Sequence, residues 1–423
     1  MSENKLPTSI PPRIVAATVA GNALEFYDFV TYAFFAVAIG KTFFPVGSDL
    51  GSLLASVAVF GVGFVSRPLG GVLIGAYADR AGRKPALLLT IVLITFGTLG
   101  LALTPSFASI GYAAPVIVVL CRLVQGLALG GEVGPSSAFL IEAAPSAQRG
   151  RYASWQTTSQ GVAILVAGLF GLLVTAAMPP ADLLAWGWRL PFVVGLLLVP
   201  LAFYLRRAMP ETLHEAPISA VNTGMVGLAR QRRLIGLSIL LILGGTVSTY
   251  VSGYMTTYAT ATLKLPPLVA MSATAMVGLT TVGFGLAGGW LCDRYGRKPV
   301  MLWPRLLTAL LILPAFGLLI ERPSLVSLLA VTGFFTALNA ASAAATLTAI
   351  PELLPRGIRA TGMAIAYAVG VTLFGGTTQF IITWLIGATG NPAAPAWYVA
   401  GTSVITLLAM AAMPESRDRV LED

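Results

Sequence analysis

Residues 75–85 read Gly-Ala-Tyr-Ala-Asp-Arg-Ala-Gly-Arg-Lys-Pro, and residues 289–299 read Gly-Trp-Leu-Cys-Asp-Arg-Tyr-Gly-Arg-Lys-Pro. Both stretches have the pattern Gly-x-x-x-Asp-Arg-x-Gly-Arg-Lys-Pro, and Asp79 and Asp293 are offset by 214 residues (293 − 79). A polar motif that recurs once in each half of a chain indicates that the two halves have related folds.

Two further patterns occur once per half and in the same order. Glu142-Ala-Ala-Pro145 with a downstream arginine is echoed by Glu352-Leu-Leu-Pro355, and Met209-Pro-Glu-Thr212 by Met413-Pro-Glu-Ser416. Together the repeats follow the second, fourth and sixth apolar runs of each half. The spacing predicts two pseudo-symmetric six-helix bundles, residues 1–208 and 233–423, joined by a cytoplasmic linker at 209–232.

The composition predicts a membrane protein. Hydrophobic residues make up 56% of the 423 residues and charged residues only 10%, against roughly 25% charged in a soluble domain. The apolar residues form runs of the roughly 20 residues that a helix needs to cross a bilayer. Backbone groups in lipid must bond internally, so these runs are helices. Twelve are expected, at 14–40, 52–77, 85–104, 113–142, 151–177, 187–208, 233–262, 268–291, 299–320, 325–350, 358–388 and 394–413.

The distribution of basic residues predicts the orientation. Of the 26 Lys and Arg, nineteen fall in segments on the side of the amino terminus, four in loops on the other side and three inside helices. Basic loops stay in the cytoplasm, so both termini are expected there. The net charge of +9 thus reflects topology and not a nucleic-acid partner. No removable signal peptide is expected, because the first twelve residues are polar and rich in proline.

Several motifs resemble the major facilitator superfamily over the whole chain. They are the two loops quoted above, Arg122-x-x-Gln125-Gly126-x-x-x-Gly130-Gly131-Glu132, Trp188-Arg189-x-Pro191-Phe192 and Pro210-Glu211-Thr212. Gly21-Asn22-x-Leu24-Glu25-Phe26-Tyr27-Asp28-Phe29, Lys41-Thr42-Phe43-Phe44-Pro45 and Arg67-Pro68-Leu69-Gly70-Gly71 resemble its metabolite:proton symporter family. The resemblance implies an all-α carrier of a bacterial inner membrane that works by alternating access, as a monomer and without a cofactor.

That resemblance implies proton symport of citrate, tricarballylate, 2-oxoglutarate, shikimate, proline or betaine. Thr249-Tyr250 and Tyr254-Met-Thr-Thr-Tyr258 look closest to the citrate and tricarballylate members. The expected function is therefore uptake of a small organic anion with protons. Symport of an osmolyte stays open, although the family's osmosensing members have a long carboxyl-terminal extension and only nine residues follow Pro414 here.

Glu25 and Asp28 are carboxylates inside the first predicted helix. An ionised group there is costly and normally faces a cavity or a partner, and the i, i+3 spacing puts both on one face with Tyr32 a turn further on. Burial disfavours the charged form, so one of them could take up the coupled proton. A buried hydrogen-bond cluster that fixes this helix is the structural alternative. The only histidine, His214, falls in the linker and cannot relay protons across the bilayer.

Arg122, in the fourth run, could lie at the depth of Glu25 and Asp28. A guanidinium presents paired donors that suit a carboxylate. Competition between substrate and Asp28 for Arg122 would couple the anion to the proton, whereas a permanent ion pair is the alternative. Glu132 lies about 15 Å further along the axis, and Arg67 is its expected partner, in a structural or gating pair that could also take part in proton coupling. Arg305 is expected to snorkel to the cytoplasmic interface.

The repeated loops carry residues expected to gate the carrier. Acids at helix ends beside basic residues can cap neighbouring helices and form ion networks, and the resemblance assigns these loops to latching the outward-facing state. As basic loops they could equally be orientation signals. The gating residues are Arg67, Gly75, Asp79, Arg80, Arg83, Asp293, Arg294 and Arg297.

Uncharged polar residues inside the predicted spans are candidate substrate contacts, although each could also be helix-packing glue. With Arg122 and Tyr32, the candidates are Gln160, Tyr254, Tyr258 and Asn339, while Gln379 is a further polar group of this kind.

Three other classes of protein fit less well. A drug antiporter of this superfamily would carry Gly-Pro-x-x-Gly-Gly in the fifth helix, which residues 151–177 lack. A sensor would bring a signalling domain. An enzyme would need a metal cluster or a nucleophile with a base, and the single histidine, in the linker, fits neither. No nucleotide-binding loop of the Gly-x-x-x-x-Gly-Lys-Ser/Thr type occurs in the sequence, so direct drive by ATP is not expected.

Overall fold

The computed structural model describes residues 12–81, 83–130, 144–207, 232–354 and 359–416. The described residues form helices and no strands. Before residue 208, in the part called here the first half, the helices are α1 (Pro12–Phe34), α2 (Ala36–Phe43), α3 (Asp49–Val65), α4 (Arg67–Ala81), α5 (Arg83–Leu103), α6 (Phe107–Ile110), α7 (Ala113–Gly130), η1 (Ser146–Gln148), α9 (Arg149–Ala177), α10 (Pro180–Ala185), η2 (Gly187–Arg189) and α11 (Leu190–Arg207).

After residue 231, in the second half, the helices are longer and less interrupted. They are α13 (Arg232–Ala261), α14 (Pro267–Tyr295), α15 (Arg297–Glu321), α16 (Leu325–Leu353), α17 (Arg359–Gly370), the π-helical turn η4 (Val371–Gly375), α18 (Gly376–Thr389) and α19 (Ala394–Ala412). The join between the halves falls largely at 208–231, outside the described residues, so the predicted linker and bundle boundaries stay a prediction.

The described part of the chain has the twelve apolar helices that the sequence predicts. Nine are long and apolar enough to cross a membrane, and the bent pair Asn22–Phe34 and Ala36–Phe43 makes a tenth when it is counted as one span. Leu88–Leu103 and Gly187–Pro200 are shorter apolar helices and complete the twelve. The protein is thus a multi-pass membrane protein with an all-α fold.

The structure adds breaks that hydropathy does not reveal. The predicted run 14–40 is two helices bent by 67°, because Phe35 leaves the helical region with φ −102° and ψ 17°. The predicted run 358–388 contains the π-helical turn at Val371–Gly375. Such turns are common at functional sites, and this one borders the central cavity described below.

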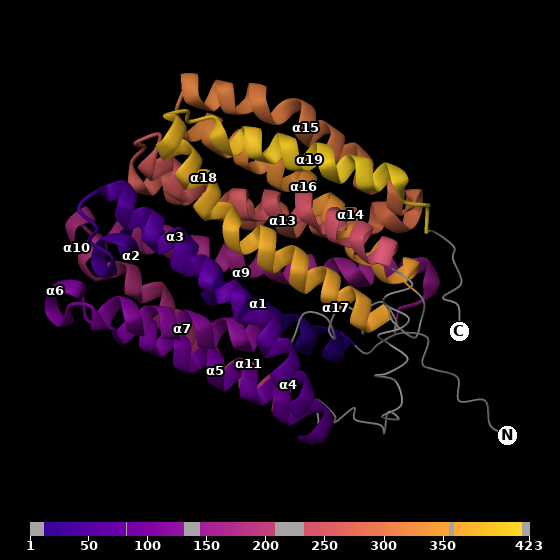
Figure 1. The fold of residues 1–423 in the computed structure, drawn as a ribbon, viewed down its shortest axis with the longest axis horizontal. Coiled ribbons are helices and arrows are strands. Elements are labelled where there is room, and N and C mark those ends of the chain that lie inside the picture. Colours follow the sequence, from indigo (N-terminus) through magenta and orange to yellow (C-terminus); the bar gives the residue numbers. More distant parts are fainter. Residues whose placement is uncertain (1–11, 82, 131–143, 208–231, 355–358, 417–423) are drawn as a thin grey trace.

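The helices run side by side along the long axis of the molecule (Figure 1). First-half helices α4, α5, α7 and α11 lie along one side, and second-half helices α15, α16 and α19 lie along the other. At one end of the bundle, called here the basic face, α9 begins at Arg149, α14 ends at Tyr295 and α15 begins at Arg297. The opposite face holds the turns at 44–48 and 262–266.

The two halves meet closely where side chains are small. A Cβ on Gly278 of α14 would overlap the backbone of Leu165 on α9, and a Cβ on Gly61 of α3 would overlap the carbonyl oxygen of Gly376 on α18. Within the first half, a Cβ on Gly126 would overlap the carbonyl oxygen of Gly63, so α7 is pressed against α3. Glycine at these positions therefore sets the helix spacing around the site.

Candidate transport site

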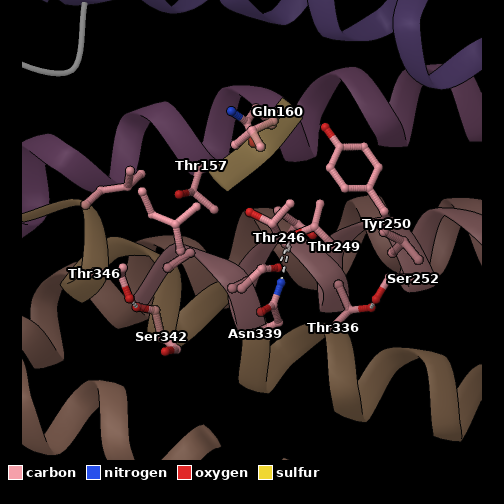
Figure 2. A pocket seen from close by; sticks show the side chains of 18 of the residues that line it. Thr157, Gln160, Thr246, Thr249, Tyr250, Ser252, Thr336, Asn339, Ser342 and Thr346 are labelled. Atoms are coloured by element: carbon pink, nitrogen blue, oxygen red, sulfur yellow. Dashed lines mark hydrogen bonds between the residues drawn. The ribbon is translucent and has the colours of Figure 1, made fainter. Parts of the chain in front are cut away.

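A cavity of about 120 Å³ lies between the two halves. Figure 2 shows Thr157 and Gln160 of α9 on one wall and Asn339, Ser342 and Thr346 of α16 on the other. Helix α13 contributes Thr246, Thr249, Tyr250 and Ser252, and aromatic contacts come from Phe26 and Tyr367. The wall thus offers hydroxyl and amide groups from both halves, as expected of a site for a small polar ligand.

Arg305 of α15 is the one charged side chain among the described residues that line this cavity. It is buried, and its Nη1 donates to the Gly244 carbonyl (2.9 Å) and to Ser248 Oγ (2.7 Å), while its Nη2 donates to Asn339 Oδ1 (3.0 Å). Its Nε has no hydrogen-bond partner among the described residues. The guanidinium is therefore held by neutral groups and has no carboxylate counter-ion in the described part of the chain.

The expectation that Arg305 snorkels to the membrane interface was wrong. The helix begins at Arg297, so residue 305 lies about 12 Å along the axis, approaching the middle of a hydrocarbon core about 30 Å thick. Asn339 and Ser248 on neighbouring helices receive it there. Depth combined with available partners is the signal that could have identified this residue.

A second polar cluster lies inside the first half and contains Asp28, Gln125 and Arg122, all buried. Arg122 Nη1 donates to Gln125 Oε1 (2.7 Å), and Gln125 Nε2 donates to Asp28 Oδ2 (2.5 Å) and to Thr98 Oγ1 (3.2 Å). Asp28 Oδ1 is buried with no hydrogen-bond partner among the described residues. Arg122 and Asp28 are close, as predicted, but Gln125 bridges them.

Aromatic rings enclose two buried arginines of the first half, Arg122 and Arg67. The guanidinium carbon of Arg122 lies 4.5 Å from the ring centre of Tyr32 and 5.0 Å from that of Phe29. That of Arg67 lies 4.0 Å from Phe64 and 4.6 Å from Phe29. Tyr250, which lines the cavity, packs edge-on against Phe64 at 5.2 Å. Tyr250 therefore borders both this cluster and the cavity, and cation–π contacts stabilise the buried charges.

Comparison with known proteins identifies the fold and the family. A family model described as "Sugar (and other) transporter" matches residues 14–215 and 220–423. The chain is a member of the major facilitator superfamily. A citrate-proton symporter of Klebsiella pneumoniae is 34% identical over 401 residues, which is 93% of this chain and 90% of the relative.

Two other relatives have different names. An alpha-ketoglutarate permease of Escherichia coli K12 is 32% identical, covering 96% of this chain and 95% of its own. A proline/betaine transporter of the same strain is 30% identical, covering 97% and 85%. The partially occluded, inward-open structure of the E. coli xylose transporter XylE aligns with a TM-score of 0.79 at 19% identity, covering 97% of this chain and 99% of that one. The protein is thus a transporter and not an enzyme.

The structure of the transporter places only some of the predicted substrate contacts in the cavity wall. Gln160 and Asn339 line the cavity. Arg122 and Tyr32 are not among its lining residues, and the Tyr32 hydroxyl donates to the Ser56 carbonyl (3.2 Å). The Tyr258 hydroxyl donates to the Pro392 carbonyl (2.8 Å), nearer the opposite face.

Tyr254 instead borders a separate vestibule of about 510 Å³ that adjoins the loops of the opposite face. Thr383 Oγ1 donates to the Tyr254 hydroxyl (2.8 Å) where α13 meets α18. The rim carries Lys264 and a surface ion pair of Lys41 with Asp49 (3.1 Å). Tyr254 and Tyr258 therefore belong to this side of the transporter and not to the cavity wall.

The second repeated loop of the transporter caps a helix of the other half. Asp293 Oδ1 accepts a hydrogen bond from the Gly150 amide (2.7 Å) and Oδ2 accepts one from the Arg151 amide (3.0 Å), at the start of α9. This is the capping predicted for an acid at this position, and it is favourable because the amino end of a helix carries partial positive charge. Arg294 is exposed and stacks on Trp290 at 5.2 Å.

Glu352 is the centre of an ion network on the basic face. Arg297 binds it through two nitrogens, Nη2 to Oε1 (2.8 Å) and Nε to Oε2 (3.0 Å). Arg149 of the first half reaches Glu352 Oε1 at 3.5 Å, and Ser416 Oγ donates to Oε2 (2.8 Å). Glu352 is part of the repeated Glu-x-x-Pro pattern in the sequence, but the pattern alone does not show that this residue joins the two halves.

Six predicted site residues cannot be placed. Glu132 lies outside the described residues, and the side chains of Glu25, Asp79, Arg80 and Arg83, together with Gly75, lie outside the described part as well. The predicted pairing of Arg67 with Glu132 therefore stays a prediction, as does the gating role of the first repeated loop.

Proposed function

We propose that this transporter takes up a small organic anion, a di- or tricarboxylate such as citrate, together with protons. The observation that carries the proposal is Arg305, a buried guanidinium in the cavity wall with no carboxylate partner among the described residues. A buried, uncompensated charge is costly, and a ligand carboxylate can offset that cost with charge-assisted hydrogen bonds. Relatives named for citrate and alpha-ketoglutarate support the same class of cargo.

The proposal moves the anion contact from Arg122 to Arg305. Arg122 is enclosed by rings and bonded to Gln125, whereas Arg305 and its partner Asn339 are at the cavity surface. Gln160 and Thr157 on the facing wall could hydrogen-bond a second carboxylate or a hydroxyl of the cargo. A ligand that touches both walls would link the halves, as alternating access requires.

The coupled proton is assigned to Asp28. Its Oδ1 lacks a partner among the described residues, so this oxygen can carry a proton without losing an existing bond. Protonation would weaken its charge-assisted contact with Gln125, which also holds Arg122. Glu25 stays a second candidate for the proton.

The basic face is proposed to be cytoplasmic, by the positive-inside rule. Asp293 and the Arg149–Glu352 pair then hold the cytoplasmic side closed, with the vestibule beside Tyr254 towards the outside. In this arrangement cargo reaches the cavity from the outside and leaves when the basic-face contacts break.

A second candidate function is symport of a zwitterionic osmolyte. Phe26, Tyr250 and Tyr367 line the same cavity, and aromatic faces can bind a quaternary ammonium group. Arg305 would then hold the carboxylate of the same ligand. The relative named as a proline/betaine transporter fits this alternative.

Uptake of labelled citrate into proteoliposomes under an inward proton gradient tests the two functions. Tricarballylate, 2-oxoglutarate and betaine serve as competitors, and Arg305→Ala is compared with Arg322→Ala, which removes an exposed arginine at the opposite face. Citrate uptake that a protonophore abolishes, and that only Arg305→Ala loses, supports the carboxylate function. Competition by betaine alone, or equal uptake by both variants, rejects it.

A further inference from the structure

Each half of the transporter contains a chain of guanidinium, amide and oxygen. In the first half Arg122 donates to Gln125 Oε1 (2.7 Å), and Gln125 donates to Asp28 Oδ2 (2.5 Å). In the second half Arg305 donates to Asn339 Oδ1 (3.0 Å), and Asn339 Nδ2 donates to Thr249 Oγ1 (2.9 Å). In both chains the amide accepts from an arginine and donates to an oxygen.

The two chains occupy related places in the repeated fold. Gln125 and Asn339 are offset by 214 residues (339 − 125), which is also the offset of the repeated aspartates Asp79 and Asp293. Gln125 is on α7 and Asn339 on α16, the fourth spanning helix of each half, while Asp28 and Thr249 are on the first. The oxygen and the amide thus have counterparts in both halves.

The arginines of the two hydrogen-bonded chains lie on helices that do not correspond. Arg122 is on α7 beside Gln125, whereas Arg305 comes from α15, the third spanning helix of the second half. In the first half the third spanning helix, α5, supplies Thr98, which also accepts a hydrogen bond from Gln125 (3.2 Å). The duplicated chain has therefore diverged at the arginine and at the terminal oxygen.

The net charge of each hydrogen-bonded chain of side chains depends on the group that supplies its last oxygen. In the first half Asp28 supplies a carboxylate, so the charges of Asp28 and Arg122 cancel. In the second half Thr249 supplies a neutral hydroxyl, and Arg305 keeps its positive charge. Only the second chain lies on the cavity wall, where Asn339, Thr249 and Arg305 all appear (Figure 2 shows the first two joined).

We infer that Thr249 determines the charge selectivity of the transport site. A hydroxyl at the place where the first half has a carboxylate leaves Arg305 without an internal counter-ion, and the ligand's carboxylate takes that place. Asn339 positions the guanidinium through its Oδ1, and Thr249 fixes the orientation of the Asn339 amide. The inference rests on the proposed function, because it assumes that the cargo is an organic anion.

The test compares Thr249→Asp with Thr249→Asn. The two side chains have nearly the same shape and differ in charge, so a purely structural role of Thr249 affects both alike. Citrate binding is measured by isothermal titration calorimetry on the full-length protein in detergent. We expect Thr249→Asn to bind within a few-fold of the native protein. Thr249→Asp should bind at least about tenfold more weakly, because loss of one charge-assisted contact has that order of effect.

The pH dependence supplies a second readout. Protonation of the carboxyl introduced by Thr249→Asp frees Arg305 again, so the affinity ratio of the two variants should approach one as the pH falls. Tyr250 and Tyr367 are the titratable side chains that share the described cavity wall with Arg305. Asp28 and Arg122 lie in the other cluster, and all four residues are present in both variants. The ratio therefore isolates the introduced carboxyl.

Three outcomes separate the inference from the function on which it rests. Native protein that binds citrate, with equal losses in both variants at all pH values, overturns the inference alone. Native protein that binds no carboxylate overturns the function and the inference together. Should Thr249→Asp fail to fold, Asn339→Asp places a carboxylate directly on Arg305 Nη2 with almost no change in shape. Native-like citrate affinity of that variant would also overturn the inference.

Discussion

Arg149 Nη1 lies 3.5 Å from Glu352 Oε1, and these two residues come from different halves of the transporter. This is the ion pair that joins the halves among the described residues. Glu352 also binds Arg297 and Ser416, so a single carboxylate organises the basic face.

Glu352→Gln is therefore expected to destabilise and to open the basic face. Removing one partner of a buried ion pair costs about 3–5 kcal/mol, so the melting temperature in detergent should fall. A cysteine placed at Ser342 in the cavity wall should react faster with a thiol reagent added from the basic face. Glu321→Gln, at an exposed position, is the control. Equal melting temperatures and labelling rates in both variants would contradict the latch.

Asp28→Asn is expected to uncouple transport from the proton gradient. The amide is close in shape to the carboxylate but cannot take up and release a proton, so gradient-driven accumulation of substrate should be lost. Exchange of external label for substrate loaded inside the vesicles should persist. Asp182→Asn, at an exposed position in α10, should keep both activities. Normal accumulation by Asp28→Asn would transfer the proton role to another carboxylate, with Glu25 the first to be tested.

Gln160→Ala is expected to weaken binding without affecting folding. Gln160 lines the cavity, and a neutral hydrogen bond contributes about 1 kcal/mol, which corresponds to about a fivefold rise in apparent KM. Gln379→Ala is the matched comparison, because this buried glutamine is absent from the described cavity wall and its Nε2 donates to the Tyr250 carbonyl (3.4 Å). It should lower the melting temperature. The prediction fails if both variants change the same quantity.

Gly126→Ala is expected to destabilise the first half. The added Cβ would overlap the carbonyl oxygen of Gly63, and overpacking of this kind costs about 1–3 kcal/mol. Gly317→Ala is the control, since a Cβ there meets nothing within 4 Å and alanine favours helix by about 1 kcal/mol. Thermal unfolding in detergent should show a lower melting temperature for the first variant only. Unchanged unfolding of Gly126→Ala would mean that α7 can move away from α3.

The sequence was sufficient for the fold because each spanning helix is nearly continuous in apolar residues and the repeats relate the halves. The helix break at Phe35 was missed because no proline or glycine marks that position. The sequence also brought Asp28 and Arg122 together correctly, since their depths in antiparallel helices can be counted. Gln125 as the bridge required side-chain geometry that residue spacing does not supply.

The cavity wall was harder to predict than the fold. Hydropathy does not show which side chains face inwards. Tyr254 and Tyr258 share one face of their helix and were therefore predicted as substrate contacts, but neither lines the cavity. Arg305 was missed because its neutral partners, Asn339 and the Gly244 carbonyl, come from two other helices. Because the partners of Arg305 are neutral oxygens, no oppositely charged residue in the sequence indicates where this arginine is buried.

The contacts at the two faces differ in strength. Opening the basic face breaks the Arg149–Glu352 pair and the two bonds by which Asp293 caps α9. Near the opposite face, a hydrogen bond from Thr257 Oγ1 of α13 to the Ala33 carbonyl of α1 (3.2 Å) joins the two halves. In the proposed orientation, we therefore expect an empty carrier to present its binding site to the surroundings of the cell for longer than to the cytoplasm.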